Sequence, residues 1–135
     1  MKKEKTLSFL LTNSNHILIE CEINYVSGFF LVDTGASNSC IDLIKSKKFN
    51  LKFEKSNELA SSATNKISET YFSKTNILKI GGCKKNDLEL VLFDMTFINN
   101  SLKEKSIKEV DGIIGGDILN QFNACIDYKR EEIRL

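Results

Sequence analysis

The chain has 135 residues, a length that predicts a single domain over residues 1–135 with a hydrophobic core of its own. Hydrophobic residues make up 41% of the sequence and charged residues 27%, a mixture that is typical of globular proteins and excludes a disordered chain. The formal net charge of +1 lacks the basic bias of nucleic-acid-binding proteins, so we expect no nucleic acid among the partners.

The first residues include lysines, as a secretory signal does, but the apolar stretch over residues 7–11 is short and contains Ser8. No small-residue cleavage site follows this stretch, so the sequence does not predict a signal peptide. No apolar run approaches the length that crosses a membrane, which is about 20 residues. We therefore expect no membrane partner and a cytoplasmic location.

Cysteine and histidine, the usual zinc ligands, are few and scattered. Cys21, Cys40, Cys83 and Cys125 would allow two disulfides by number, but they form no CxxC pair, and His16 is the single histidine. We expect free, partly buried thiols and no metal or other cofactor. One histidine also disfavours a Ser-His-Asp or Cys-His catalytic group, and His16 is expected at the edge of a strand.

Short apolar stretches separated by turn residues predict strands along most of the chain. The predicted strands cover residues 6–11, 17–25, 29–32, 76–80, 88–93, 124–128 and 131–135. The predicted turns lie at residues 13–15, 27–28 and 81–82. Many short strands at close spacing predict an all-β, barrel-like fold.

Helical segments are expected in three places. Residues 118–122 predict the one clear helix, with Asp117 as its N-cap. Residues 98–109 are polar and lysine-rich and predict an exposed loop or a weak helix. About one helical turn is expected within residues 39–48. Its inward side chains would be Ile41 and Ile44, and its solvated ones Lys45, Lys47 and Lys48.

The most informative stretch is the apolar run over residues 29–32, which continues directly into Asp33, Thr34 and Gly35. Such a run predicts a strand that is buried on both faces. A carboxylate at the end of a buried strand is costly, because burial disfavours its charged form. Gly35 allows a tight turn and a close approach by another segment. Taken alone, Asp33 fits a functional carboxylate and the first polar residue of a turn equally well.

A second motif far downstream distinguishes these two interpretations. Ile113 and Ile114 form an apolar pair that ends on Gly115, immediately before the predicted helix. Together with the apolar-apolar-Asp-Thr-Gly-Ala pattern at residues 31–36, this arrangement resembles the retropepsin-type aspartic peptidases, which are single-lobed relatives of pepsin. The resemblance covers most of the chain, from Ile17 to the C-terminus. It implies a closed β-barrel with one short C-terminal helix and a flap hairpin that covers the substrate.

The resemblance also implies a mechanism. Peptide hydrolysis by two carboxyl groups needs one group that is ionised and one that is protonated. This chain has a single Asp-Thr-Gly motif. The resemblance therefore implies an aspartic endopeptidase that acts as a symmetric homodimer on peptide or protein substrates, with one Asp33 from each subunit. It assigns catalysis to Asp33, Thr34 and Gly35, and substrate contacts to Ala36, Ser37 and Ile113.

Residues 59–72 predict a projecting hairpin with its turn at residues 65–66. In the family that this chain resembles, such a hairpin is the flap, which implies substrate contacts by Ser62, Ala63 and Thr64. Family flaps often carry glycines at the tip, and none is present here. A plain surface hairpin therefore stays an alternative.

Two other departures concern the dimer. Retroviral relatives commonly have an acidic residue in place of Ser37 and an arginine in place of Gly116, which form an ion pair, so a dimer of this chain must use other contacts. Lys2, Lys3 and Lys5 could pair with Glu131 and Glu132 across an interface, or both ends could be frayed. The alternative functions are a non-catalytic retropepsin-fold dimerisation or peptide-binding module, and an unrelated barrel whose Asp-Thr-Gly is a surface turn.

Overall fold

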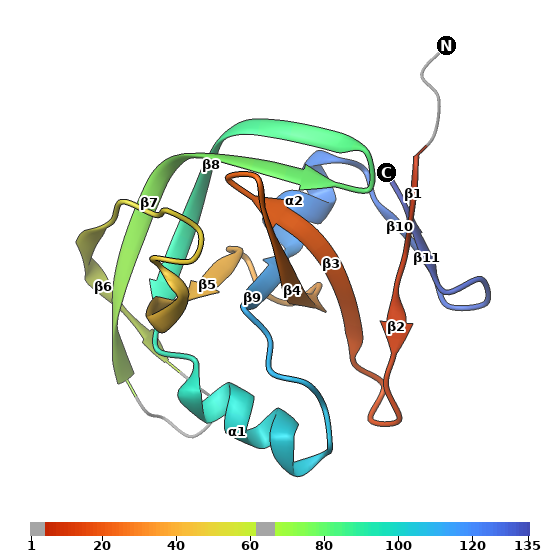
Figure 1. The fold of residues 1–135 in the computed structure, drawn as a ribbon, viewed down its shortest axis with the longest axis horizontal. Coiled ribbons are helices and arrows are strands. Elements are labelled where there is room, and N and C mark those ends of the chain that lie inside the picture. The colour runs from red at the N-terminus through yellow and green to blue at the C-terminus, as the bar shows by residue number, and fades with distance from the viewer. Residues whose placement is uncertain (1–4, 62–66) are drawn as a thin grey trace.

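The computed structural model describes residues 5–61 and 67–135, and these form a closed six-stranded barrel (Figure 1). Around the barrel the strand order is β3 (Ile17–Ile23), β4 (Val26–Asp33), β9 (Gly112–Gly115), β5 (Cys40–Asp42), β8 (Cys83–Phe93) and β7 (Ile67–Ile80). The ring closes because β7 also pairs with β3. Two further strands, β2 (Leu10–Leu11) and β6 (Glu54–Ser61), extend the sheet from β3 and β7. The predicted all-β barrel is therefore confirmed.

The two ends of the described chain pair with each other in a second, three-stranded sheet (Figure 1). Its central strand is β11 (Glu132–Arg134), with β1 (Thr6–Ser8) on one side and β10 (Cys125–Asp127) on the other. Backbone hydrogen bonds join Lys5 and Leu135 in both directions, at 2.7 and 3.3 Å. From Lys5 onward, the chain end is therefore paired within its own subunit and is not frayed.

The hairpin turn between β3 and β4 differs from the predicted turn at residues 27–28. It lies at Asn24 and Tyr25, whose φ angles of 50° and 67° are those of a two-residue turn that matches the twist of the strands. Gly28 instead lies inside β4, where a Cβ atom would come within 2.7 Å of the Phe30 ring. The glycine thus signals close packing at this position and not a turn.

Three helical segments accompany the strands: η1 (Leu43–Lys45), α1 (Thr96–Glu104) and α2 (Gly116–Gln121). The predicted helical turn and the predicted C-terminal helix correspond to η1 and α2. In η1, Ile44 is 67% exposed, so its predicted inward orientation is wrong, whereas Ile41 is fully buried.

Helix α1 begins two residues before the predicted range of 98–109 and ends within it, and tertiary contacts stabilise it. The buried Asn99 side chain accepts a hydrogen bond from the Val110 N–H at 2.9 Å and donates one to the Val110 carbonyl at 3.1 Å. Leu102 lies on the same helix and is also buried. These contacts attach α1 to the segment that leads into β9, an arrangement that residue propensities alone do not encode.

The hydrophobic core has two parts, one on each side of β4 and β9. Phe30, Val32 and Ile114 belong to the larger cluster. The smaller cluster includes Ile113, and Leu31 packs against it. The apolar run that precedes Asp33 is thus packed on both faces, as predicted, although Phe29 and Leu31 are only partly buried.

A buried carboxylate fixes the start of β4 against the segment before β9. Asp111 is 6% exposed and accepts a hydrogen bond from the Phe29 N–H at 2.9 Å. Lys48 lies 3.0 Å and Lys45 3.7 Å from its two oxygens. These two lysines therefore neutralise the charge of a buried acid. Lys47 and Lys48 are exposed, as predicted, whereas Lys45 is half-buried.

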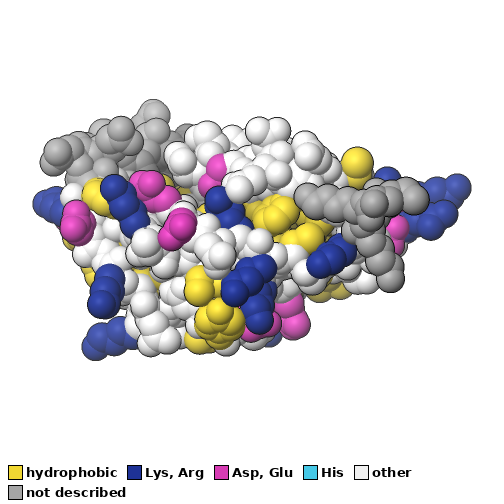
Figure 2. Space-filling model, turned by 90° about the horizontal axis from the view of Figure 1, so that it is seen from above, with side chains coloured by type: hydrophobic (Ala, Val, Ile, Leu, Met, Phe, Trp, Pro, Cys, Tyr) yellow, Lys and Arg dark blue, Asp and Glu magenta, His cyan; other side chains and the backbone are white. Residues whose placement is uncertain are grey.

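The described part of the face in Figure 2 carries charges of both signs. On the face in Figure 2, lysine, arginine and acidic side chains are interspersed, and hydrophobic side chains lie in small separate groups. Within residues 5–61 and 67–135, no helix has the length and apolar character needed to cross a membrane.

Candidate active site

Asp33 is the last residue of β4, and its carboxylate is exposed at the start of a tight loop. The Gly35 N–H donates a hydrogen bond to Asp33 Oδ1 at 2.9 Å, and the Ala36 N–H donates one to the Asp33 carbonyl at 3.1 Å. These bonds orient the carboxylate relative to the backbone of its own loop. Thr34 and Ser37 are exposed on the same loop, and Ala36 is half-buried.

The parallel pairing of β4 with β9 brings the second motif against this loop. Asp33 is in register with Gly115, and the Gly116 N–H donates a hydrogen bond to the Ala36 carbonyl at 2.7 Å. A Cβ atom on Gly115 would lie only 2.6 Å from the Ala36 carbonyl oxygen, a distance that real side chains do not adopt. Glycine is therefore required at residue 115 for the Asp33 loop to pack in this position.

Ser39 connects the two motifs, a role that no local sequence pattern indicates. Its fully buried hydroxyl accepts a hydrogen bond from the Gly115 N–H at 2.8 Å and donates one to Asp117 Oδ1 at 2.7 Å. The Ser39 N–H also donates to Asp117 Oδ2 at 3.0 Å. The N-cap of α2 is Gly115, so the predicted N-cap role of Asp117 is wrong. Its carboxylate instead holds the segment that follows the Asp33 loop.

The remaining predicted site residues, Ile113 and the three residues of the predicted flap, lie outside the Asp33 loop. Ile113 pairs with Leu31 and is 7% exposed, so its side chain is covered in the described chain and its assignment to a substrate pocket stays a prediction. The predicted hairpin is present, because β6 pairs with β7 up to Ser61 and Ile67. Its turn, with Ser62, Ala63 and Thr64, lies outside the described residues.

Asp42 is a second buried carboxylate near the loop, but its surroundings are structural. It accepts hydrogen bonds from the N–H groups of Met95 at 3.2 Å and Ile44 at 3.4 Å. Burial is the main cause that raises the pKa of Asp42 above its ordinary value, and these two hydrogen bonds partly oppose the rise. Since Asp42 is fully buried, it is not available to a substrate.

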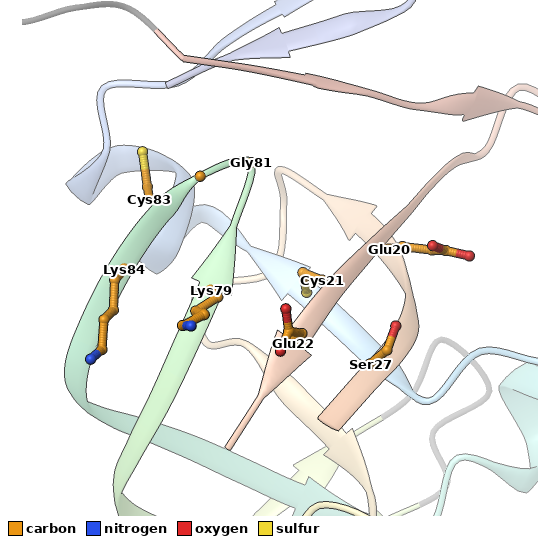
Figure 3. Close-up of a pocket in the computed structure, with 9 residues that line it drawn as sticks. Glu20, Cys21, Glu22, Ser27, Lys79, Gly81, Cys83 and Lys84 are labelled. Carbon is orange, nitrogen blue, oxygen red and sulfur yellow. The ribbon is translucent and has the colours of Figure 1, made fainter. Parts of the chain in front are cut away.

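A hollow of about 340 Å³ lies beside Asp33 and Thr34. A larger one, of about 420 Å³, lies elsewhere on the barrel (Figure 3). Figure 3 shows Lys79 and Lys84, on β7 and β8, across from Glu20, Glu22 and Ser27, on β3 and β4. Neither motif contributes a residue to the larger hollow, so we assign no catalysis to it.

The cysteines match the predicted free thiols, since all four are unpaired in the structure. Burial raises the pKa of the Cys40 thiol to about 12 and is also the main cause of the raised pKa of Cys21. Among the described residues, no group of three or more His, Cys, Asp or Glu side chains is arranged to hold a metal ion.

Comparison with known proteins agrees with this geometry. The sequence profile of the family described as aspartyl protease matches residues 19–118 of the chain. A search of curated proteins found no match.

Many solved structures match this chain, and three of them show the likeness. A retropepsin-like aspartic protease from Rickettsia conorii superposes with a TM-score of 0.61 at 19% identity, over 98% of this chain and 88% of that one. The EIAV protease in complex with the inhibitor HBY-793 superposes with a TM-score of 0.62 at 18% identity, over 85% of this chain and 95% of that one. The retroviral protease-like domain of Ddi1 from Leishmania major superposes with a TM-score of 0.55 at 16% identity, over 91% of this chain and 82% of that one. At these identities the comparison establishes a retropepsin-like fold.

Proposed function

Because the chain belongs to the aspartyl protease family, we propose that it is an active aspartic endopeptidase that hydrolyses bonds in peptide or protein substrates. The observation that carries this proposal is the Asp33 loop. Its carboxylate is exposed and is oriented by the Gly35 N–H. Gly115 and Gly116 pack against the Ala36 carbonyl of the same loop. A scaffold that only bound peptides would have no use for an oriented, exposed carboxylate at this position.

The chemistry requires a second carboxylate, and a second copy of the chain would supply it. In the proposed homodimer, the two Asp33 side chains meet at the two-fold axis and share one proton, because two close carboxylates do not both ionise. The ionised one accepts a proton from the attacking water, and the protonated one donates a hydrogen bond to the substrate carbonyl. When the tetrahedral intermediate collapses, its C–N bond breaks, and the proton that the carboxylate took from the water passes to the leaving amine.

The other predicted site residues also have proposed roles. The Thr34 hydroxyl would hydrogen-bond the partner subunit's loop, which fixes the distance between the two acids. Ala36 and Ser37 would line the substrate groove, and Ser62, Ala63 and Thr64 would cover it from the flap.

Replacing the acid tests the mechanism. The variant Asp33→Asn should lose peptide hydrolysis and should retain its melting temperature or gain slightly, because it removes the repulsion between two acids. The matched control Asp87→Asn changes an exposed aspartate outside both motifs and should retain activity. Hydrolysis by Asp33→Asn at the parental rate would exclude the carboxylate mechanism.

Dilution tests the dimer. If each subunit holds half of the site, the activity per mole of chain must fall as the protein is diluted below the dimer dissociation constant. The dissociation constant is measured in parallel by analytical ultracentrifugation, and a pepstatin-type inhibitor should shift the equilibrium toward the dimer. Constant activity per chain in a sample shown to be monomeric would refute the shared site.

A further inference from the structure

The barrel opens along one edge of β3, at the hollow of about 420 Å³ that Figure 3 shows. On this edge β2 pairs with β3 only as far as Leu18, and β7 pairs with it only as far as Glu22. Beyond that point β7 turns away through residues 81–82 and pairs with β8 instead. No described strand pairs with Glu20 on this side of β3, so the sheet has a local opening there.

The backbone of Glu20 faces this opening. The hairpin between β3 and β4 has a two-residue turn, so Ile23 and Val26 form its first hydrogen-bonded pair. Hydrogen-bonded and non-hydrogen-bonded pairs alternate along an antiparallel ladder, which makes Glu20 and Phe29 a non-hydrogen-bonded pair. The N–H and C=O groups of Phe29 agree with this, since both bond to Asp111. The N–H and C=O groups of Glu20 therefore point into the opening, like those of a strand at the edge of a sheet.

Charged side chains of opposite sign line the two sides of the hollow. Glu20 and Glu22 lie on β3, and Lys79 and Lys84 lie across from them on β7 and β8 (Figure 3). The two ammonium groups lie over the Tyr25 ring, at 4.8 and 5.8 Å from its centre. None of these four charged side chains forms an ion pair with another described residue. The hollow thus presents two carboxylates and two ammonium groups that do not neutralise each other.

We propose that this hollow is a second peptide-binding site, which takes the C-terminal end of a peptide whose next-to-last residue is lysine or arginine. The peptide adds to the open edge of β3 and hydrogen-bonds to the backbone of Glu20, as strands add to sheet edges. Its terminal carboxylate accepts hydrogen bonds from Lys79 and Lys84. The inference goes beyond the proposed catalysis, because neither motif contributes a residue to this hollow.

The positions of the charges set the direction of the bound peptide. Lys79 is in register with Glu22 and with Lys84, so both lysines lie toward the C-terminal end of β3. A peptide whose carboxylate meets them runs parallel to β3, with its next-to-last residue opposite Glu20. Side chains of neighbouring strands that lie opposite each other are on the same face of the sheet. A basic side chain at this position therefore lies beside the carboxylates of Glu20 and Glu22.

The probe is the dipeptide acetyl-Lys-Ala with a free C-terminal carboxylate, titrated into ¹⁵N-labelled protein and followed by NMR. At about 10 mM peptide, even a Kd of about 1 mM gives near saturation. We expect the largest shift changes at the amides of Glu20 and Gly82, which line the hollow. The C-terminal amide of the same peptide, and acetyl-Glu-Ala, should each bind about fivefold more weakly, because each lacks one of the two charge contacts.

Charge variants separate recognition from folding. The double variant of Lys79→Gln and Lys84→Gln should weaken binding about fivefold and should no longer distinguish the free carboxylate from the amide. The double variant of Glu20→Lys and Glu22→Lys should reverse the preference, so that acetyl-Glu-Ala binds better than acetyl-Lys-Ala. A loss of folding cannot produce such a reversal. The control is the double variant of two exposed lysines outside this hollow, Lys52→Gln and Lys74→Gln, and it should bind as wild type does.

The outcome is independent of catalysis, because Asp33→Asn should bind acetyl-Lys-Ala with the wild-type Kd. The inference is overturned if wild type shows no shift change at about 10 mM peptide, or if the free and amidated peptides bind equally well. It is also overturned if the shift changes centre on Asp33 and Gly35, because the peptide then occupies the candidate active site. Loss of the proposed peptidase function would leave this binding test unchanged.

Discussion

The buried Ser39 hydroxyl offers a sharp test of how the two motifs are held together. In Ser39→Ala the Gly115 N–H loses its acceptor, and an unsatisfied buried donor costs about 1–3 kcal/mol. The same substitution removes a donor from the Asp117 carboxylate, where a hydrogen bond to a charged group contributes about 1.5–3 kcal/mol. Asp117 is half-buried and retains its bond from the Ser39 N–H, so we take the lower end of the second value.

The combined expectation is a loss of about 3 kcal/mol in the free energy of unfolding. For a domain of this size that corresponds to a fall of roughly 9 °C in Tm, at about 3 °C per kcal/mol. Urea unfolding followed by circular dichroism measures the free energy, at one fixed protein concentration because a dimer would make stability depend on concentration. The activity of the folded fraction should fall as well, since the same hydroxyl supports the Asp33 loop through Gly115.

Two controls make the result interpretable. Ser37→Ala removes an exposed hydroxyl two positions away and should change stability by less than about 0.5 kcal/mol. In a double-mutant cycle, Ser39→Ala and Asp117→Asn should be non-additive by more than about 0.5 kcal/mol, because the two side chains contact each other. A Ser39→Ala variant within about 0.5 kcal/mol of wild type would show that the hydroxyl does not connect the motifs.

Three further predictions concern titration and reactivity. Ala36→Ser should move the acidic limb of the bell-shaped pH–rate profile to lower pH, because the added hydroxyl can donate to the ionised Asp33 pair; superimposable profiles would show that residue 36 has no such effect. Because burial raises the pKa of Asp42 in the folded state, its ionisation disfavours folding, so wild type should lose stability relative to Asp42→Asn as the pH rises from about 4 to about 7, and a constant difference in urea unfolding would contradict this. Since burial raises the pKa of Cys40 to about 12, iodoacetamide at about pH 8 should modify exposed Cys125 in the native protein and spare Cys40, whereas equal labelling in a peptide map would refute it.

The sequence predicts those parts of the site whose residues are adjacent along the chain. The apolar run before Asp33 and the pair before Gly115 each specify a strand followed by glycine, and the family resemblance adds that they lie together. The sequence predicts a turn at residues 27–28 because glycine is a common turn residue, but Gly28 packs against Phe30 and the turn lies at Asn24 and Tyr25.

The role of Ser39 and the true role of Asp117 do not follow from the sequence, for a different reason. The hydrogen bonds from Ser39 to Gly115 and Asp117 span 76 and 78 residues, and no local pattern distinguishes such a serine from a surface one. His16 is close to Asp33 because β3 and β4 are antiparallel, with Ile17 opposite Val32. Side-chain roles that arise from strand register become visible only after the pairing is known.

The long separation between the two motifs also has a consequence for the order of events during synthesis. The Asp33 loop leaves the ribosome early, but Gly115 and Asp117, which complete its support, are made 76 to 78 residues after Ser39. At roughly 5–20 residues per second, this interval lasts about 4–16 seconds. During that time β4 has no β9 to pair with, so the carboxylate cannot adopt its final position. The Asp33 loop of a nascent chain therefore lacks its final support until residue 117 has been translated.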